Sequence, residues 1–139
     1  MTLDDLRPGL KHSATIAIGE ALAVPASGRL LGETADMPPV FATANMIAFV
    51  EWTCVAALMP YLASHQRTVG TRVDMTHIAA TPIGMQVIAE VELIEIDGRR
   101  LRFRASCRDE VEPIGEGFHE RTVIDHARFM ERLGRKKAG

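Results

Sequence analysis

The pattern of apolar positions changes near the middle of the chain. The segment between Pro39 and Pro60 is apolar on nearly every side and holds no internal glycine or proline. Since proline interrupts a helix, this uninterrupted run with a proline at each end predicts one long helix. A helix that is apolar nearly all round belongs in an interior, covered by other elements.

Period-two alternation follows after Gly70. Such alternation is typical of half-buried strands, and Asp97-Gly98 is a dipeptide typical of a tight hairpin. The strands predicted here are Thr71 to Thr76, Gln86 to Ile96, Arg99 to Arg108 and Phe118 to Ile124. In the third of these, alternate arginines indicate a solvated face. Together the segments predict an antiparallel meander of about four strands.

The segments before the long helix and at the C-terminus predict further elements. His12 to Gly19 alternates loosely and predicts another strand. Val24 to Pro39 contains several glycines and prolines and predicts a loop leading to the helix. His126 to Leu133 predicts a short amphipathic end, and the last five residues, RKKAG, predict a frayed tail.

One buried helix and one antiparallel sheet predict an α+β architecture in which the sheet curls around the helix, the arrangement called a hotdog fold. A chain of 139 residues suits a single domain, predicted over residues 1–139. Such small sheets commonly pair with a second copy, which would hide an edge strand and complete the cover on the helix. The sequence therefore predicts a homodimer.

Charge and composition exclude several classes of protein. Sixteen Lys and Arg against eighteen Asp and Glu leave a net charge of −2, so the chain has no electrostatic footprint for nucleic acid. No apolar run reaches the roughly 18 residues typical of a membrane span, and the first residues are acidic rather than basic. We expect a cytoplasmic protein that binds no membrane. Its two cysteines, Cys54 and Cys107, are expected to be reduced and to serve packing.

Glu51 is the most informative single position, because it lies in the middle of the predicted apolar helix. Burial of a carboxylate is costly and raises its pKa unless a cation or hydrogen-bond donors stabilise the charge, which is how catalytic carboxylates are tuned. The alternative is a side chain that reaches solvent or makes a structural hydrogen bond.

Thr43 lies at the start of the same helix and is interpreted first as an N-cap, whose hydroxyl accepts a backbone N–H bond. If it lies just before the helix, its hydroxyl and the free N–H groups of the first turn face a common space that attracts anions. Eight helical residues separate Thr43 from Glu51 by about 12 Å along the axis. A third group must bridge that gap.

His77 is the candidate for the bridging group, at the end of a predicted strand before the Thr81-Pro82 turn. Histidine titrates near neutrality, and a carboxylate held against it would leave its other nitrogen free to act as a base. A lone histidine at a strand end is also commonly a satisfied surface residue. The remaining histidines lack comparable surroundings and have no metal spacing; they are His12, His65, His119 and His126.

At these residues the chain resembles the hotdog-fold thioesterases related to fluoroacetyl-CoA thioesterase. The resemblance is ungapped from Pro39 to about Leu133. Its motifs are PVFAT from Pro39 to Thr43, Glu51, Trp52 and Cys54, MPYL from Met59, VGT from Val69, THIAATPIG from Thr76, DGRRL from Asp97 and HERTVI from His119.

The resemblance implies hydrolysis of an acyl-CoA thioester by a cytosolic dimer with sites at the subunit interface, and it implies no metal or cofactor. The catalytic residues of the family match Thr43, Glu51 and His77. Gly70 matches a glycine whose backbone approaches the thioester, and Arg121 matches an arginine near the acyl or CoA group. In the resulting hypothesis Glu51 holds His77, and His77 activates water or Thr43. Attack by the carboxylate to form an anhydride and attack by water both stay open.

The loop before PVFAT departs from the family. The fluoroacetyl-CoA enzyme carries aromatic residues that cover its small acyl pocket, whereas the matching positions here are Thr34 and Met37. These side chains make a less rigid cover. We therefore expect a broader preference for short acyl groups, or a different small acyl group.

Two other functions compete with thioester hydrolysis. A hotdog hydratase or dehydratase acting on a 3-hydroxyacyl thioester would need an aspartate close to a histidine, and Asp74 and His77 are the one such pair, although strand alternation places them on opposite sides. A non-catalytic acyl-CoA-binding module would use the same pocket. It would have no need to bury a glutamate.

Overall fold

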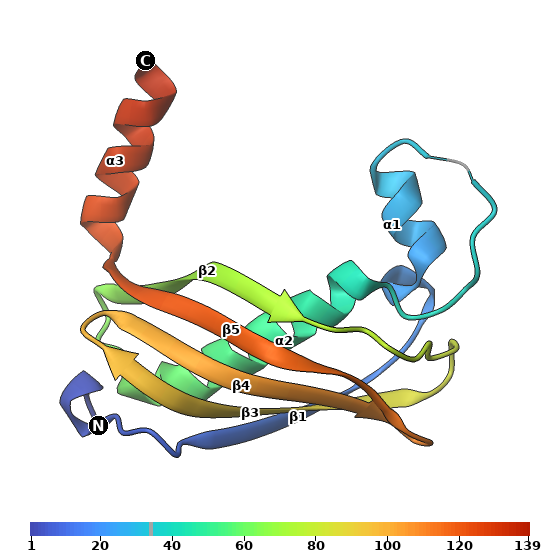
Figure 1. Cartoon of the computed structure of the whole chain (residues 1–139). Helices are drawn as coiled ribbons and strands as arrows, with labels where there is room; N and C mark the ends of the chain where they lie inside the picture. The colour runs from blue at the N-terminus through green and yellow to red at the C-terminus, as the bar shows by residue number, and fades with distance from the viewer. Residues whose placement is uncertain (34) are drawn as a thin grey trace.

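An antiparallel sheet with one long helix across its inner face forms the body of the protein (Figure 1). The computed structural model describes every residue except residue 34. The helical elements are η1 (Leu3–Asp5), η2 (Glu20–Leu22), α1 (Val24–Leu30), α2 (Thr43–Leu58), η3 (Met59–Tyr61) and α3 (His126–Ala138). The strands are β1 (Lys11–Ala17), β2 (Gln66–Met75), β3 (Gln86–Asp97), β4 (Arg100–Asp109) and β5 (Pro113–Asp125). This α+β arrangement is the predicted hotdog fold.

The order of the strands differs from a simple meander. Across the sheet it is β1-β3-β4-β5-β2, with every neighbouring pair antiparallel. The hairpin between β3 and β4 forms where predicted, but its two loop residues are Gly98 and Arg99, since Asp97 ends β3 and pairs with Arg100. Gly98 has the positive φ of 60° that such turns favour. The prediction of a continuous meander was wrong for β2, because this strand pairs with β5 at the far edge.

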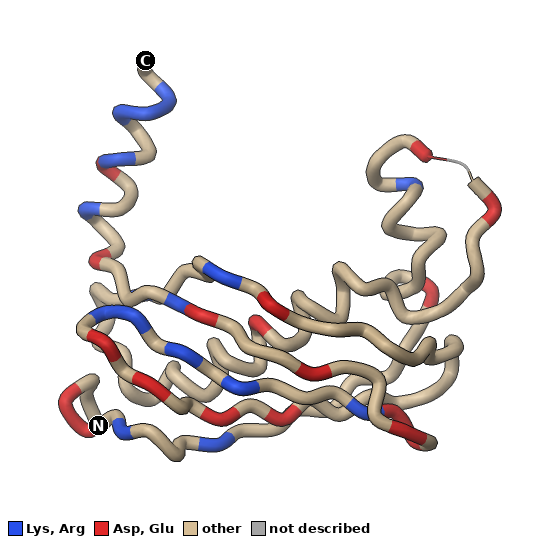
Figure 2. Tube along the Cα trace, viewed as in Figure 1, with Lys and Arg blue, Asp and Glu red and all other residues tan. Residues whose placement is uncertain are grey.

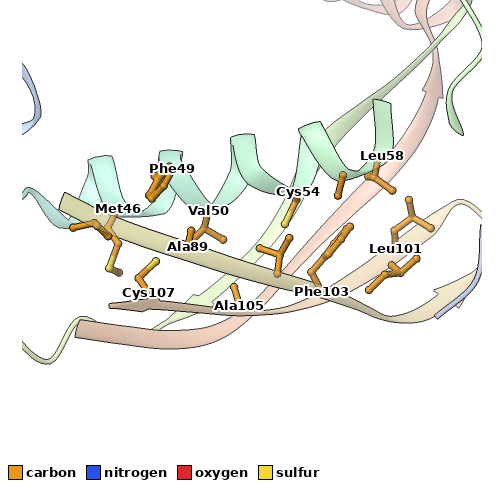
Figure 3. Packing of buried hydrophobic residues seen from close by; sticks show 14 of the residues in the cluster. Met46, Phe49, Val50, Cys54, Leu58, Ala89, Leu101, Phe103, Ala105 and Cys107 are labelled. Atoms are coloured by element: carbon orange, nitrogen blue, oxygen red, sulfur yellow. The ribbon is translucent and has the colours of Figure 1, made fainter. Parts of the chain in front are cut away.

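The core lies between α2 and the inner face of the sheet. The buried positions of α2 recur every three or four residues and are Met46, Phe49, Val50, Thr53, Cys54, Ala57 and Leu58. Figure 3 shows side chains of α2, among them Val50 and Leu58, facing Ala89, Leu101 and Phe103 of the sheet. The hydroxyl of the buried Thr53 donates to the Phe49 carbonyl, which satisfies it within the helix.

The opposite face of α2 is open in the single chain. Trp52 on that face is 70% exposed, although the sequence predicted a helix covered all round. The β2 edge is open as well, and α1 and α3 project beyond it near its two ends (Figure 1). An uncovered apolar helix face beside an unpaired strand edge is the surface that a second chain would cover.

Two end segments are more regular than the sequence indicated. The expected loop from Val24 to Pro39 begins with the helix α1, where Pro25 occupies a first-turn position that proline tolerates. The expected frayed tail is helical to Ala138, because Asp125 caps the first turn of α3 and the basic residues lie in its last turn.

The outer face of the sheet carries the arginines of β4, as predicted. Figure 2 shows these basic positions beside acidic positions of β3. They are not merely solvated, however, since Arg100 and Arg102 both bind the carboxylate of Glu120, and Arg102 also stacks over the Phe118 ring at 4.4 Å. A broad open hollow also lies on this outer face, away from α2.

The residues from 43 to 61 form a helical stretch that is long and apolar enough to cross a membrane. The prediction that no apolar run reaches this length was therefore wrong. Core helices of soluble proteins meet the same criterion. Here the stretch includes α2, whose residues Met46, Cys54 and Leu58 are fully buried against the sheet. Its apolar character therefore has a structural reason in the core.

Both cysteines are unpaired and buried, as predicted. Burial raises the pKa of Cys54 to about 12 and that of Cys107 to about 11. Each stays a neutral thiol at physiological pH, which suits packing.

Candidate active site

Thr43 and His77 meet at the N-terminal end of α2. The Thr43 hydroxyl lies 2.7 Å from Nδ1 of His77. The N-cap of the helix is Ala42, with no side-chain cap bond, so the interpretation of Thr43 as an N-cap was wrong. Thr43 is the first residue of the helix itself, and its exposed hydroxyl bonds to the imidazole instead of to the backbone.

Backbone bonds bring His77 to this position. His77 lies in the segment just after β2, where the Ile78 N–H donates to the Ile114 carbonyl of β5 at 2.7 Å. A few residues later, the Thr81 carbonyl accepts from the Phe41 N–H at 2.8 Å. The segment is thus tied both to the sheet and to the chain that enters α2.

The surroundings of His77 favour the neutral form of its imidazole. The Phe41 ring meets the imidazole edge to face, with 6.4 Å between centroids. Burial lowers the pKa of His77 below its ordinary value, although the nearby backbone of Ala79 partly opposes this effect. Its Nε2 is buried and lies within hydrogen-bond distance of no acceptor among the described residues. A neutral imidazole with Nδ1 against a hydroxyl can accept that hydroxyl's proton.

Glu51 lies further along α2 and pairs with a cation. Its Oε2 is 3.2 Å from Nη1 of Arg121 and 3.9 Å from Nε2 of His119. The side chain is 37% exposed in the single chain, which fits the alternative of a carboxylate that reaches solvent better than it fits burial among apolar residues. Arg121 on β5 supplies the stabilising cation that the sequence argument called for.

The hypothesis that Glu51 holds His77 was wrong within one chain. The bonded partner of His77 is Thr43, whereas the ion-pair partners of Glu51 are on β5. The cause is the helix: eight residues separate Thr43 from Glu51, or about 12 Å along the axis. A histidine bonded at the first residue of α2 does not reach a carboxylate two turns later.

Arg121 and Gly70 lie beside each other on the neighbouring strands β5 and β2. The Arg121 guanidinium is buried and also donates to the hydroxyl and the carbonyl of Thr68, each at 2.9 Å. A Cβ on Gly70 would lie 2.6 Å from Oε2 of Glu51, so the carboxylate would have to move away from its present position. Glycine at this position therefore lets the β2 backbone approach the carboxylate.

His119 is the functional candidate that the sequence analysis set aside. It is 1% exposed and contacts Arg121 through Nε2 at 3.1 Å. Strand alternation carries a signal that could have identified it: His119, Arg121 and Val123 share one face of β5, and a face that includes a buried valine is an inner face. Two polar residues on an inner face require partners.

Thr34 and Met37 are the two loop positions expected to cover the acyl group. Thr34 lies outside the described residues. Met37 lies between α1 and α2 and is 48% exposed in the single chain. Asp74, the partner that a hydratase would need, is exposed and pairs in register with Phe118, which lies on the outer face of the sheet.

The chain thus carries two clusters: a hydroxyl and an imidazole where α2 begins, and a carboxylate, a guanidinium and a second imidazole midway along it. The sequence profile of the family described as fluoroacetyl-CoA-specific thioesterase matches residues 24–127, which include both clusters. The chain belongs to this thioesterase family. The fluoroacetyl-CoA thioesterase of Streptantibioticus cattleyicolor is 44% identical to it over 104 residues, which cover 75% of each chain.

Several solved structures share this fold closely. The fluoroacetyl-CoA thioesterase FlK superposes with a TM-score of 0.91 at 38% identity, covering 96% of this chain and 98% of FlK. A mutant of FlK in complex with fluoroacetate and CoA superposes at 0.84 with 38% identity, covering 89% and 99%. A thioesterase superfamily member of Thermus thermophilus, at 20% identity, shares the fold with a TM-score of 0.83, covering 95% and 93%.

Proposed function

We propose that this thioesterase hydrolyses a short-chain acyl-CoA to the free acid and CoA with Thr43, His77 and Glu51 as its catalytic residues. The observation that carries the proposal is the 2.7 Å contact between the Thr43 hydroxyl and Nδ1 of His77 at the start of α2. Membership of the thioesterase family supplies the reaction, and favours hydrolysis over a hydratase or a non-catalytic acyl-CoA-binding module.

The proposed chemistry follows from these groups. Hydrolysis forms a bond between a water oxygen and the acyl carbon and breaks the carbon–sulfur bond, and the thiolate of CoA takes up a proton. His77 accepts a proton from Thr43 or from the attacking water. The first turn of α2 has backbone N–H groups without intrahelical partners, which suit a developing oxyanion. Glu51 supplies the carboxylate, either as the nucleophile that forms an anhydride or as the group that orients water.

Gly70 and Arg121 are proposed as substrate-binding residues beside Glu51. Arg121 fixes the carboxylate by Nη1, and the missing side chain of Gly70 leaves room next to it. Thr34 and Met37 are proposed as part of the acyl cover. The reduced state predicted for both cysteines and a CoA ester as substrate together favour a cytoplasmic location.

The substrate panel that tests the proposal consists of acetyl-, fluoroacetyl-, propionyl-, butyryl- and longer acyl-CoA, with release of free CoA measured by a thiol reagent. We expect turnover of the short members and rates for acetyl-CoA and fluoroacetyl-CoA within about 200-fold of each other, since a hydrophobic pocket discriminates between such similar acyl groups by only about 1–3 kcal/mol. The aliphatic Met37 stands where the fluoroacetyl-CoA enzyme has an aromatic cover. A strong preference for fluoroacetyl-CoA would contradict the expected selectivity. Binding of acyl-CoA without release of CoA would contradict the proposal that the protein hydrolyses it.

We further propose a homodimer in which each site is shared between two chains. Thr43 and His77 form one half of a site and Glu51 with Arg121 the other, and the two halves lie about 12 Å apart along α2. A two-fold axis beside the open β2 edge would bring the first half of one chain to the second half of its partner. The exposed Trp52 and the unpartnered Nε2 of His77 support a second chain at this face.

Mixed dimers test the shared site. A chain with His77→Ala and a chain with Glu51→Gln, co-expressed with different tags, are each expected to be nearly inactive alone. In their heterodimer one of the two shared sites has both wild-type halves, so a random mixture should recover about a quarter of wild-type activity. The matched control pairs His77→Ala with Thr43→Ala, two lesions in the same half, which should recover nothing. Equal recovery in both mixtures, no recovery in the first, or a monomer by light scattering would overturn the shared site.

A further inference from the structure

His119 makes two hydrogen bonds of opposite polarity in the interior of the protein. It lies on β5, and its Nδ1 is 2.8 Å from the backbone carbonyl oxygen of Arg72 on β2. Its Nε2 is 3.1 Å from Nη1 of Arg121. The side chain is almost completely buried, so water does not compete for either nitrogen.

These two partners determine the tautomer of the imidazole. A carbonyl oxygen can only accept, so Nδ1 must carry the hydrogen that it donates to Arg72. A guanidinium can only donate, so Nε2 must present a lone pair to Arg121. The neutral Nδ1–H form is the one form of His119 that satisfies both contacts. Burial, and to a lesser extent the charge of Arg121, lower the pKa of His119, although the hydrogen bond to the Arg72 carbonyl and the carboxylates of Glu51 and Glu120 oppose them.

Arg121 connects His119 to the carboxylate. Nε and Nη2 of the guanidinium both donate to Thr68, while Nη1 donates to both Glu51, at 3.2 Å, and His119. His119 therefore accepts the second hydrogen bond from Nη1 of Arg121, the same nitrogen that donates to the Glu51 carboxylate. The planar guanidinium is held at both ends, by Thr68 on one side and by His119 on the other.

We propose that His119, in its neutral Nδ1–H form, is a positioning residue that fixes Arg121 so that Nη1 holds the Glu51 carboxylate in its catalytic orientation. This inference rests on the proposed catalytic role of Glu51. His119 itself does not touch the acyl group in this scheme. It acts through Arg121. The charged groups that act on it are Arg121 and Glu120 on its own strand and Glu51 on α2.

Two substitutions of His119 each keep one of its two hydrogen bonds and remove the other. In His119→Gln the amide reaches as far as Nε2 and can offer its oxygen to Arg121, which retains the acceptor. In His119→Asn the shorter amide can donate to the Arg72 carbonyl in place of Nδ1 but leaves Nη1 of Arg121 without that acceptor. His12→Gln on the exposed strand β1 is the control for loss of a histidine.

For acetyl-CoA we expect His119→Asn to lower kcat about tenfold to a hundredfold, because a small displacement of a catalytic group has effects of that size, with a much smaller change in KM. His119→Gln should stay within about threefold of wild type at a comparable melting temperature. If the two folded His119 variants had equal kcat while Glu51→Gln was inactive, the positioning role of His119 would be overturned and the proposed function would stand. Absence of CoA release by the wild-type chain would overturn the proposed function instead.

A spectroscopic measurement keeps the inference testable if either variant fails to fold. Nitrogen-15 NMR of the wild-type imidazoles, with His119 assigned by its absence from the spectrum of any variant that folds or by through-bond correlation, is expected to show a protonated Nδ1 and an unprotonated Nε2 at neutral pH. A neutral Nε2–H form or an imidazolium at that pH would contradict the proposal, whatever the activity of the protein.

Discussion

Glu51→Gln is expected to lower kcat for acetyl-CoA about 10²–10⁴-fold and to leave the fold intact, because positioned proton transfer or carboxylate attack supplies an effect of this size. Glutamine has nearly the same shape and keeps an oxygen that accepts from Nη1 of Arg121. It has neither the charge nor the proton capacity of the carboxylate. The lost activity would then report on chemistry rather than on packing.

The measurement is release of free CoA together with thermal unfolding, for wild type and variant. Glu90→Gln is the matched control, since Glu90 is exposed on β3 and the substitution removes one carboxylate far from α2. The control should retain wild-type turnover. Full activity in a folded Glu51→Gln variant would reduce Glu51 to a structural partner of Arg121.

His77→Ala is expected to lower kcat by a similar factor of about 10²–10⁴, because the Thr43 hydroxyl loses the base that lies 2.7 Å from it. The variant also loses the edge-to-face contact with Phe41, so a modest fall in melting temperature is expected. Substrate binding should change less than turnover, since Arg121 and Gly70 lie in the other cluster.

His12→Ala is the control for this variant, because His12 is an exposed residue of β1. Added imidazole should restore part of the activity of His77→Ala and none to Glu51→Gln, since only the former lacks an imidazole. Loss of activity in His12→Ala, or wild-type turnover in folded His77→Ala, would contradict the assignment of His77 as the base.

The sequence predicted the elements of this fold better than their arrangement. The prolines at 39 and 60 enclose α2, and the turn that contains Gly98 joins β3 to β4, because each of these signals acts on nearby residues. The place of β2 depends on pairing with β5, about 50 residues later. Several alternating strands can satisfy the same local pattern in different orders, so alternation does not settle which strands are neighbours.

The candidate site was predictable in its residues and not in their contacts. Thr43 and Glu51 were identified by their positions in an apolar helix, and their separation follows from the rise of that helix. The resemblance implied that His77 acts on water or on Thr43, and the structure shows the contact with Thr43. No local pattern predicts this contact, because it depends on bonds from the segment after β2 to β5 and to Phe41. His119 was missed because a histidine on a strand becomes informative when the inner face of that strand is known.

The most direct test of the proposed catalysis is release of free CoA from acetyl-CoA, followed with a thiol reagent for the wild-type chain and for Glu51→Gln at equal concentration. We expect steady release by the wild-type chain and a rate lower by about two to four orders of magnitude for the variant. No release by the wild-type chain from acetyl-CoA or from any other short acyl-CoA, or equal release by both proteins, would contradict it.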